Sequence, residues 1–302
     1  MTIQTVSGTI DKEQLGRTYI HEHLNIDLSG PKGDSDANLD NIDSVVKEIE
    51  YLKSIGVDSI VEVTNIGMGR NISKLKEVWE KTRMNIVAST GYYKDFFYPA
   101  EVYDLDYREL AKIMISEINK GIKYTETKAH VIGEVGTSKD TITHSELKVL
   151  KGSALAHRET GHPIFTHTSL GTMALEQLEL FKKEKVDLSK VLIGHLDLNC
   201  HKEYHLRIAE YGCYLGFDTI GKTKYEKDEN RIRCIKYLID RGHIDQIVLS
   251  QDVTRKSHLK EGGGIGYSYL MESFIPKAIS MGISKEEINH IMIENPKRLL
   301  DV

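Results

Sequence analysis

The chain has 302 residues, a formal net charge of −5 at pH 7 and 40% hydrophobic residues, which is enough for one large α/β domain with a substantial core. Its acidic balance and scattered basic residues argue against a nucleic-acid-binding protein, and no apolar run of about 18 residues predicts a membrane span. Three cysteines without Cys-x-x-Cys spacing and an N-terminus without a secretory pattern predict a reduced, cytoplasmic protein.

The first predicted strand, Thr18–Ile26, contains two histidines, His21 and His23. Residues two apart share one face of a strand but lie about 200° apart on a helix, so both imidazoles are expected to point the same way. Neutral imidazole is a common metal ligand, and two on one strand would form half a metal site. In a chain with 13 histidines such a pair can also arise by chance.

Helical and strand patterns then alternate along the chain. Residues 28–38, rich in Gly, Pro and Asp, predict an irregular loop. Strands are predicted to begin near residues 20, 60, 87, 131, 164, 191, 214 and 247. Helices are predicted over residues 40–55, 72–83, 107–122, 147–159, 171–185, 204–211, 229–241, 269–281 and 285–300, the last with Ser284 and Glu287 as a capping box.

Eight strand–helix units without a linker predict one domain, a single (β/α)8 TIM barrel over residues 1–302. The alternative is an open doubly wound sheet. That fold normally has a glycine-rich phosphate-binding turn after the first strand, whereas this chain has histidines there.

Side chains able to bind metal follow five of the predicted strands. They are His21, His23, Glu134, His167, His195 and Asp252. Each alone could be structural, as a helix cap or a buried histidine. Because the carboxyl ends of barrel strands meet at one mouth, we expect these six side chains to lie together.

Six donors exceed what one tetrahedral zinc ion needs and suit two divalent ions that share a carboxylate. Glu134 is the predicted bridge, since a carboxylate offers two oxygen atoms and an imidazole cannot bridge in this way. The mixture of nitrogen and oxygen donors favours Zn, Mn, Co or Fe over Mg or Ca without choosing among them.

The motifs around these residues are His21-Glu22-His23-Leu24, Gly133-Glu134-Val135-Gly136-Thr137, Thr166-His167-Thr168 and Gly194-His195-Leu196-Asp197. With them, nearly the whole chain resembles the phosphotriesterase-like family of the amidohydrolase superfamily. Phosphotriesterases and many related lactonases have a carboxylated lysine at the bridging position. In this chain Glu134 occupies that position, and in this respect the chain resembles the branch of phosphotriesterase homology proteins. The difference argues against assigning phosphotriester hydrolysis to this chain from the resemblance.

The resemblance implies a role for each of these side chains. His21, His23 and Asp252 would hold the more buried metal, and His167 and His195 the more exposed one. Glu134 would bridge both ions, and a hydroxide shared by them would be the nucleophile. Asp252 would carry the proton to the leaving group, while the exposed metal would polarise the carbonyl or phosphoryl oxygen. A homodimer is expected from the family alone.

Loops at the mouth predict an anionic substrate, because Arg and Lys suit phosphate. The expected substrate contacts are Lys222, Lys224, Arg255, Tyr267 and Tyr92 or its neighbour Tyr93. Any one of the cations could equally be a solvated surface residue. Asp218 is expected to orient a neighbour, Glu22 to face the helices as a structural partner, and His201 and His258 to serve structure.

These features predict a binuclear metal hydrolase that opens a sugar lactone, with or without a phosphate group. The alternative is the same metal centre acting on carboxylic esters or phosphotriesters. A barrel that binds metal or ligand without catalysis is disfavoured, because Asp252 and all the presumed ligands are present.

Overall fold

A parallel eight-stranded barrel forms the centre of the structure, a computed structural model that describes residues 2–302. The strand order is β3-β6-β7-β8-β9-β10-β11-β12, so each barrel strand pairs with the next barrel strand along the chain. The strands are β3 (Thr18–Glu22), β6 (Ser59–Glu62), β7 (Asn85–Thr90), β8 (Val131–Thr137), β9 (Ile164–Thr168), β10 (Val191–Ile193), β11 (Tyr214–Phe217) and β12 (Ile247–Leu249). The predicted fold class and all eight predicted strands are confirmed.

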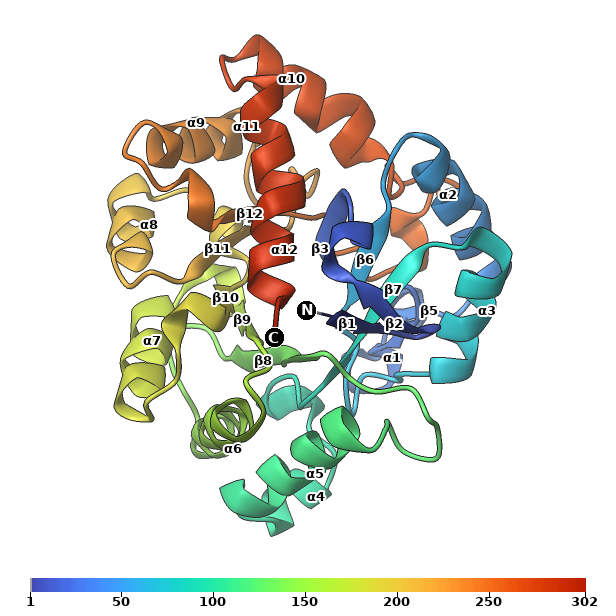
Figure 1. Ribbon diagram of the computed structural model, residues 1–302, viewed down its shortest axis with the longest axis vertical. Helices are drawn as coiled ribbons and strands as arrows, with labels where there is room; N and C mark the ends of the chain where they lie inside the picture. Colours follow the sequence, from blue (N-terminus) through green and yellow to red (C-terminus); the bar gives the residue numbers. More distant parts are fainter. Residues whose placement is uncertain (1) are drawn as a thin grey trace.

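Helices surround the barrel as an outer ring (Figure 1). They are α2 (Ile42–Ser54), α3 (Ile72–Thr82), α5 (Tyr107–Asn119), α6 (His144–Thr160), α7 (Ala174–Lys183), α8 (Lys202–Ala209), α9 (Asp228–Ile239), α10 (Ile275–Ser280), α11 (Lys285–Asn289) and α12 (Asn295–Leu300), with the short α1 (Ser29–Lys32) and α4 (Glu101–Asp104). Among the described residues, no helix has the length and apolar character needed to cross a membrane.

The pattern that predicted each helix is also what packs it on the barrel. In α2, Val45, Ile49 and Leu52 are buried at helical spacing, and Asn41 accepts a hydrogen bond from Ser44 N at the start of the helix. In α11, Ser284 and Glu287 form the predicted capping box.

Four segments differ from the predictions. Residues 28–38 are not wholly irregular, because they contain α1 and a short 3-10 turn and lead into a strand, β5 (Asn38–Leu39), that pairs with β4 (Ile26–Asp27). An N-terminal hairpin, β1 (Thr2–Thr5) with β2 (Gly8–Asp11), was not predicted. The two C-terminal helices are each interrupted by a π-helical turn, at Leu270–Phe274 and at His290–Glu294.

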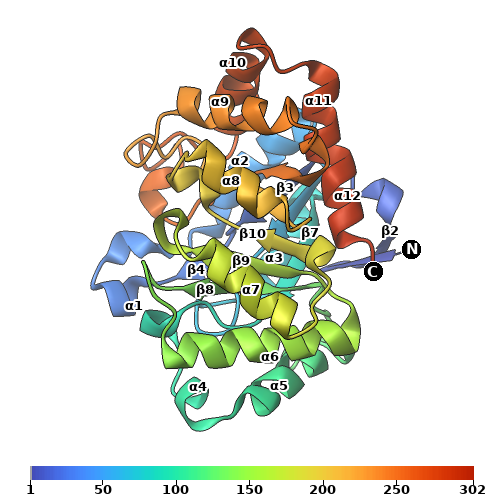
Figure 2. The ribbon, with the colours of Figure 1, turned by 90° about the vertical axis from the view of Figure 1, so that its left-hand side faces the viewer.

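Apolar side chains fill the interior of the barrel towards the amino ends of its strands, and polar residues occupy the carboxyl ends. This inner cluster takes one side chain from every strand of the barrel, among them Ile20, Val61, Val87, Phe165 and Val248. Both chain termini lie at the same end of the barrel, opposite to α1 (Figure 2). The polar strand ends therefore meet at the end away from the termini.

Side chains rather than a ladder of backbone hydrogen bonds join the first strand to the last. His21 N donates to Ser250 Oγ at 3.1 Å, and that hydroxyl donates to Glu22 Oε1 at 2.7 Å. Glu22 also accepts the backbone N–H groups of Gln251, Asp252 and Val253. Glu22 was expected to face the helices, but its buried carboxylate closes the barrel seam and positions the residues after β12.

A buried histidine near the termini makes stability depend on pH. His130 Nε2 donates to Leu300 O at 2.8 Å, and Gln4 N donates to His130 Nδ1 at 3.4 Å. Burial first, and then the neighbouring His162, lowers the pKa of His130 from 6.5 to about 4. The neutral imidazole is the form that this environment stabilises.

We therefore expect the free energy of unfolding to fall as the pH drops from 6.5 towards 4, because there the unfolded chain binds a proton that the folded chain rejects. The full effect of this group is about 3 kcal/mol. Chemical denaturation at several pH values would measure it. His130→Asn should have a smaller pH slope than the wild type, and equal slopes would contradict the assignment to His130.

Candidate metal centre

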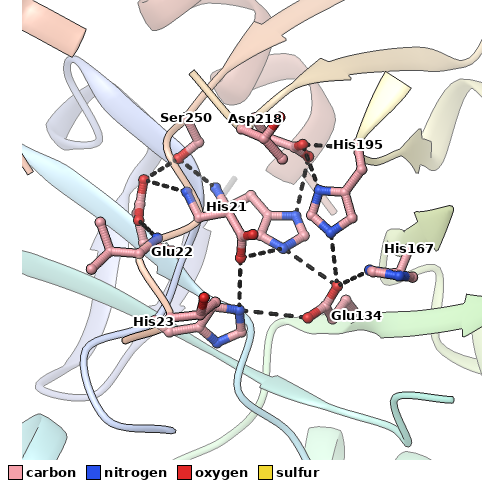
Figure 3. Close-up of polar contacts among 12 residues, drawn as sticks. His21, Glu22, His23, Glu134, His167, His195, Asp218 and Ser250 are labelled. Carbon is pink, nitrogen blue, oxygen red and sulfur yellow. Dashed lines mark hydrogen bonds and ion pairs between the residues drawn. The ribbon is translucent and has the colours of Figure 1, made fainter. Parts of the chain in front are cut away.

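The six predicted side chains converge at the carboxyl end of the barrel. Figure 3 shows Glu134 among the four histidines. Glu134 Oε2 lies 3.2 Å from His167 Nδ1, 3.4 Å from His195 Nε2 and 3.5 Å from His21 Nε2. The other oxygen, Oε1, lies 3.5 Å from His23 Nε2. One carboxylate from β8 thus faces four imidazoles on both of its oxygen atoms.

Asp252 completes the cluster from the end of β12. Its Oδ1 lies 3.3 Å from His23 Nε2 and 3.9 Å from His21 Nε2. His195 and Asp252 both have positive φ, 61° and 54°. Such conformations are uncommon for residues other than glycine and persist where the surrounding fold imposes them. The backbone at these two strand ends is therefore held so that the side chains enter the cluster.

The donor atoms fall into groups of the size of a metal site. Two groups of three residues have donor atoms that all lie within 4.8 Å of one another. The first group is His21, His23 and Asp252, and the second is Glu134, His167 and His195. A third, overlapping group is His21, His195, Asp218. The first two groups correspond to the two ligand sets that the family resemblance implies.

Burial and unpaired nitrogen atoms favour metal ions over a purely structural network. His21, His23 and His195 are almost completely buried, and His21 Nε2 and His23 Nε2 find no hydrogen-bond partner among the described residues. A buried polar atom without a partner is costly. Nitrogen and carboxylate donors that meet in a buried site fit transition-metal ions well.

Both carboxylates are ionised, which is the form that binds metal. Burial opposes ionisation of Glu134, but the imidazoles of His167, His195 and His21 that face its carboxylate hold its pKa well below the ordinary value. Burial also opposes ionisation of Asp252. The Lys222 ammonium and His23 outweigh this effect, so the pKa of Asp252 is lowered as well.

A second layer of residues orients the histidines. Asp218, at the end of β11, places Oδ1 2.8 Å from His195 Nδ1 and Oδ2 3.2 Å from His21 Nδ1. Its carboxylate therefore faces the outer nitrogen of one histidine in each half of the cluster, with a hydrogen bond to that of His195. The geometry agrees with the orienting role expected for Asp218, although the sequence did not indicate that it serves two histidines at once.

Asp218 is itself held by a buried ion pair that the sequence did not reveal. Asp197 Oδ1 accepts the backbone N–H of Asp218 at 3.2 Å, and Asp197 Oδ2 accepts Arg231 Nε from α9 at 2.7 Å. Only the partial motif Gly194-His195-Leu196-Asp197 pointed to this region. Arg231 lies 34 residues further along the chain, and no spacing rule connects the two.

A cavity of about 780 Å³ opens above the cluster. Of the predicted substrate contacts, Lys222, Lys224 and Arg255 line it. Lys222 forms an ion pair with Asp252. Arg255 is paired with Asp34 at 2.5 Å and Asp36 at 3.3 Å, so much of its charge is used within the protein.

Two of the expected substrate contacts, Tyr267 and Tyr92, do not line the cavity. Tyr267 does not face the mouth, because it is fully buried and its hydroxyl donates to His23 O at 2.5 Å. It supports the strand end from behind. Tyr92 is also fully buried and donates to Glu101 at 3.1 Å. Its neighbour Tyr93 is the tyrosine in the cavity wall, 3.3 Å from His167 Nδ1.

The cavity wall contains residues that the sequence did not single out as substrate contacts. Lys94 Nζ lies 3.0 Å from Ser169 Oγ and 3.3 Å from His167 Nε2. His258, expected to be structural, also lines the cavity, and burial followed by Lys222 lowers its pKa to about 4. By contrast, His201 accepts a hydrogen bond from Tyr204 N at the start of α8, a structural role as expected.

Comparison with known proteins decides the family. The sequence model of the phosphotriesterase family matches residues 1–300. The chain belongs to the phosphotriesterase family. It is 46% identical over 283 residues to the phosphotriesterase homology protein of Escherichia coli, covering 94% of this chain and 97% of that protein. It is also 31% identical to the N-acetyltaurine hydrolase of Danio rerio, covering 99% and 97%.

Solved structures of the family share the fold closely. The crystal structure of the E. coli phosphotriesterase homology protein, complexed with phosphate in the active site, has a TM-score of 0.94 at 45% identity, covering 97% of this chain and 100% of that chain. A lactonase from Listeria monocytogenes has a TM-score of 0.94 at 31% identity, covering 99% of each. The family member described here is a metal-dependent hydrolase.

Asp218→Asn tests the orienting layer. The change keeps the shape but removes the charge that faces two imidazoles, so we expect metal affinity to fall by about 10- to 100-fold. Competition with a calibrated chelator would measure it. Asp43→Asn, at a surface position 81% exposed, is the matched control. Unchanged metal affinity in Asp218→Asn would show that the carboxylate does not support the metal centre.

Proposed function

We propose that the protein is a binuclear metal-dependent lactonase whose substrate carries an anionic group such as a phosphate. The observation that carries this proposal is the Glu134 carboxylate set among four imidazoles at the floor of a cavity rich in cations. The barrel would act as one hydrolase domain on a small molecule.

Two divalent ions, with zinc as the first candidate, fit the two donor groups. The buried ion would be held by His21, His23 and Asp252, the exposed ion by His167 and His195, and Glu134 would serve both. When bound, such ions supply Lewis acidity and acidify water for attack on an ester carbonyl. Metal analysis of the protein as purified would identify them.

Asp252 is the proposed proton carrier. One of its oxygen atoms faces His23 at 3.3 Å and the other is paired with Lys222, and its side chain is 11% exposed at the cavity floor. An ionised carboxylate in this position can take a proton from the attacking water and give it to the departing alkoxide of the opened lactone ring. Lys222 would fix the orientation of Asp252 during this transfer.

Asp252→Asn should retain a side chain of the same shape but lose the base. We expect kcat/KM for a lactone to fall by about 10²- to 10⁴-fold. Because Asp252 is also a proposed ligand, bound metal must be measured in the same sample. Unchanged turnover in the variant would exclude Asp252 as the proton carrier.

The charge of the cavity favours an anionic substrate. Five basic side chains line it, against three acidic ones, Asp36, Glu134 and Asp252, an excess of two before any metal is counted. Among the described residues, neither Lys94 nor Lys224 has a carboxylate within ion-pair distance. A phosphate or carboxylate on the substrate would provide that partner.

What is known of the similar proteins supports an anionic substrate. One solved relative holds phosphate in its active site and another is a lactonase. Relatives named N-acetyltaurine hydrolase make an anionic N-acyl compound a useful second substrate class, which the same cationic cavity would accept. Neutral esters and phosphotriesters remain the alternative chemistry for this centre.

Lys224→Met tests the anion preference without touching the metal ligands or the Arg255 ion pairs. We expect KM for a phosphorylated sugar lactone to rise about tenfold, which corresponds to one exposed charge-assisted contact, while kinetics with the uncharged lactone stay unchanged. Steady-state assays with both lactones, N-acetyltaurine, an aryl ester and a phosphotriester would decide. Equal turnover of charged and uncharged lactones by the wild type would remove the anionic-substrate proposal.

A further inference from the structure

Lys94 is a charged side chain beside the metal centre whose individual role is not explained by the proposed metal ligands or by the proton carrier. It follows β7 and lies partly buried in the cavity wall, with its Nζ 5.2 Å from the centre of the Tyr93 ring. Nζ also lies 3.0 Å from Ser169 Oγ and 3.3 Å from His167 Nε2. These contacts hold an ammonium group next to a proposed ligand of the exposed ion.

The contacts of Lys94 leave its ammonium group only partly satisfied. Ser169 Oγ donates to Thr137 O at 2.7 Å, so this hydroxyl accepts a hydrogen bond from Lys94. An ammonium group has three N–H donors, and no carboxylate of the described residues lies within ion-pair distance of Lys94. The second polar neighbour, His167 Nε2, is an acceptor only when that nitrogen carries no proton.

Metal binding would take His167 Nε2 away from Lys94. His167 Nδ1 faces Glu134 Oε2 at 3.2 Å, so Nδ1 is the nitrogen placed to bind an ion that Glu134 shares. A neutral imidazole that binds through Nδ1 carries its proton on Nε2. Nε2 would then donate to Ser169 Oγ, which is 3.2 Å away, and could not accept from Lys94. Ser169 would remain the single acceptor for Lys94 among the described residues.

A second lysine without an ion pair lies on the other side of the barrel mouth. Lys224 follows β11, which is four strands away from β7 in the order of the barrel. Strands four apart in an eight-stranded barrel stand on opposite sides of it. Both lysines line the cavity that also exposes Glu134 and Asp252. The cavity therefore offers free positive charge on two opposite sides of the proposed metal ligands.

We propose that Lys94 binds the carboxylate that the substrate acquires when its lactone ring opens, an assignment that rests on the proposed lactonase function. Hydrolysis breaks the bond between the acyl carbon and the ring oxygen, which becomes a hydroxyl, and the acyl carbon becomes a carboxylate at one end of the opened chain. A phosphate held on the Lys224 side would direct the acyl end across the cavity, towards Lys94. The free N–H groups of Lys94 match the charge of that carboxylate.

A purely structural role explains Lys94 less well. If Lys94 served to orient His167, the hydrogen bond would have to survive metal binding, yet Ser169 is the acceptor that a protonated Nε2 needs. Two of the three N–H groups of Lys94 would then have no acceptor among the described residues. A carboxylate has two oxygen atoms and can accept both.

The test measures binding of three probes to the full-length, metal-loaded protein by isothermal titration calorimetry. Phosphogluconate, with its phosphate on the terminal carbon, carries a carboxylate and a phosphate at opposite ends. Gluconate carries the carboxylate alone, and sorbitol phosphate, phosphorylated on its terminal carbon, carries the phosphate alone. In Lys94→Met we expect Kd for phosphogluconate and gluconate to rise about tenfold, the size of one charge-assisted contact, while Kd for sorbitol phosphate stays unchanged.

Lys224→Met should show the converse pattern, with weaker binding of the two phosphate probes and unchanged binding of gluconate. Lys183→Met removes an exposed lysine at the end of α7 and is the matched control, which should bind all three probes like the wild type. Lys94→Gln keeps a donor for Ser169 but loses the charge. It should match Lys94→Met, and it replaces that variant if the latter folds poorly. Bound metal, measured in every sample, should equal that of the wild type.

The proposal is overturned if the Lys94 variants bind gluconate like the wild type, or if they weaken sorbitol phosphate as strongly as gluconate. It is also overturned if they lose bound metal, because Lys94 would then serve His167. Failure of the lactonase function is a separate result. Wild-type protein that hydrolyses no lactone would refute the function, whereas the difference between the carboxylate and phosphate probes tests Lys94 alone.

Discussion

A buried carboxylate surrounded by four imidazoles is the constraint on which the rest of this site depends. Glu134 would be costly to bury as an isolated anion, and its stability in that position requires hydrogen-bonding or metal partners on both oxygen atoms. The four histidines supply those partners from three other strands, at 3.2 to 3.5 Å. The barrel must therefore bring its strand ends to one point before any chemistry is possible.

The outer layers show how the fold maintains that point. Glu22 joins the first strand to the residues after the last one, so the seam of the barrel and the position of Asp252 are fixed by the same side chain. Asp218 holds two histidines, and Asp197 with Arg231 holds Asp218. Each layer consists of a buried charge satisfied by several hydrogen bonds, which is the condition under which buried charges are stable. Misplacement in an outer layer is therefore transmitted to the proposed metal ligands.

The cavity separates two tasks. Its floor holds the proposed metal ligands and Asp252, which are the groups suited to hydrolysis, while basic side chains on the surrounding loops provide a positive field for the substrate. Lys222 connects the two tasks, because it lines the cavity and is paired with Asp252. Arg255 is paired with Asp34 and Asp36 instead, so it joins the α1 region to the loop after β12 more than it offers a free charge to a ligand.

The sequence by itself determined the barrel and the members of the central cluster. Hydrophobic periodicity located all eight strands. In a parallel barrel the residues that follow the strands all lie at the same end, the shared mouth. For this reason the sequence alone predicted that His21, His167, His195 and the two carboxylates lie in one cluster. The loops gave no such rule: Tyr267 looked like a mouth residue and is a buried support for His23. Arg231 and Asp197 meet only in the tertiary structure, because they are brought together by the packing of α9 against a loop 34 residues away in the sequence. Local patterns specify local geometry, and contacts between distant segments are decided by how the whole chain packs.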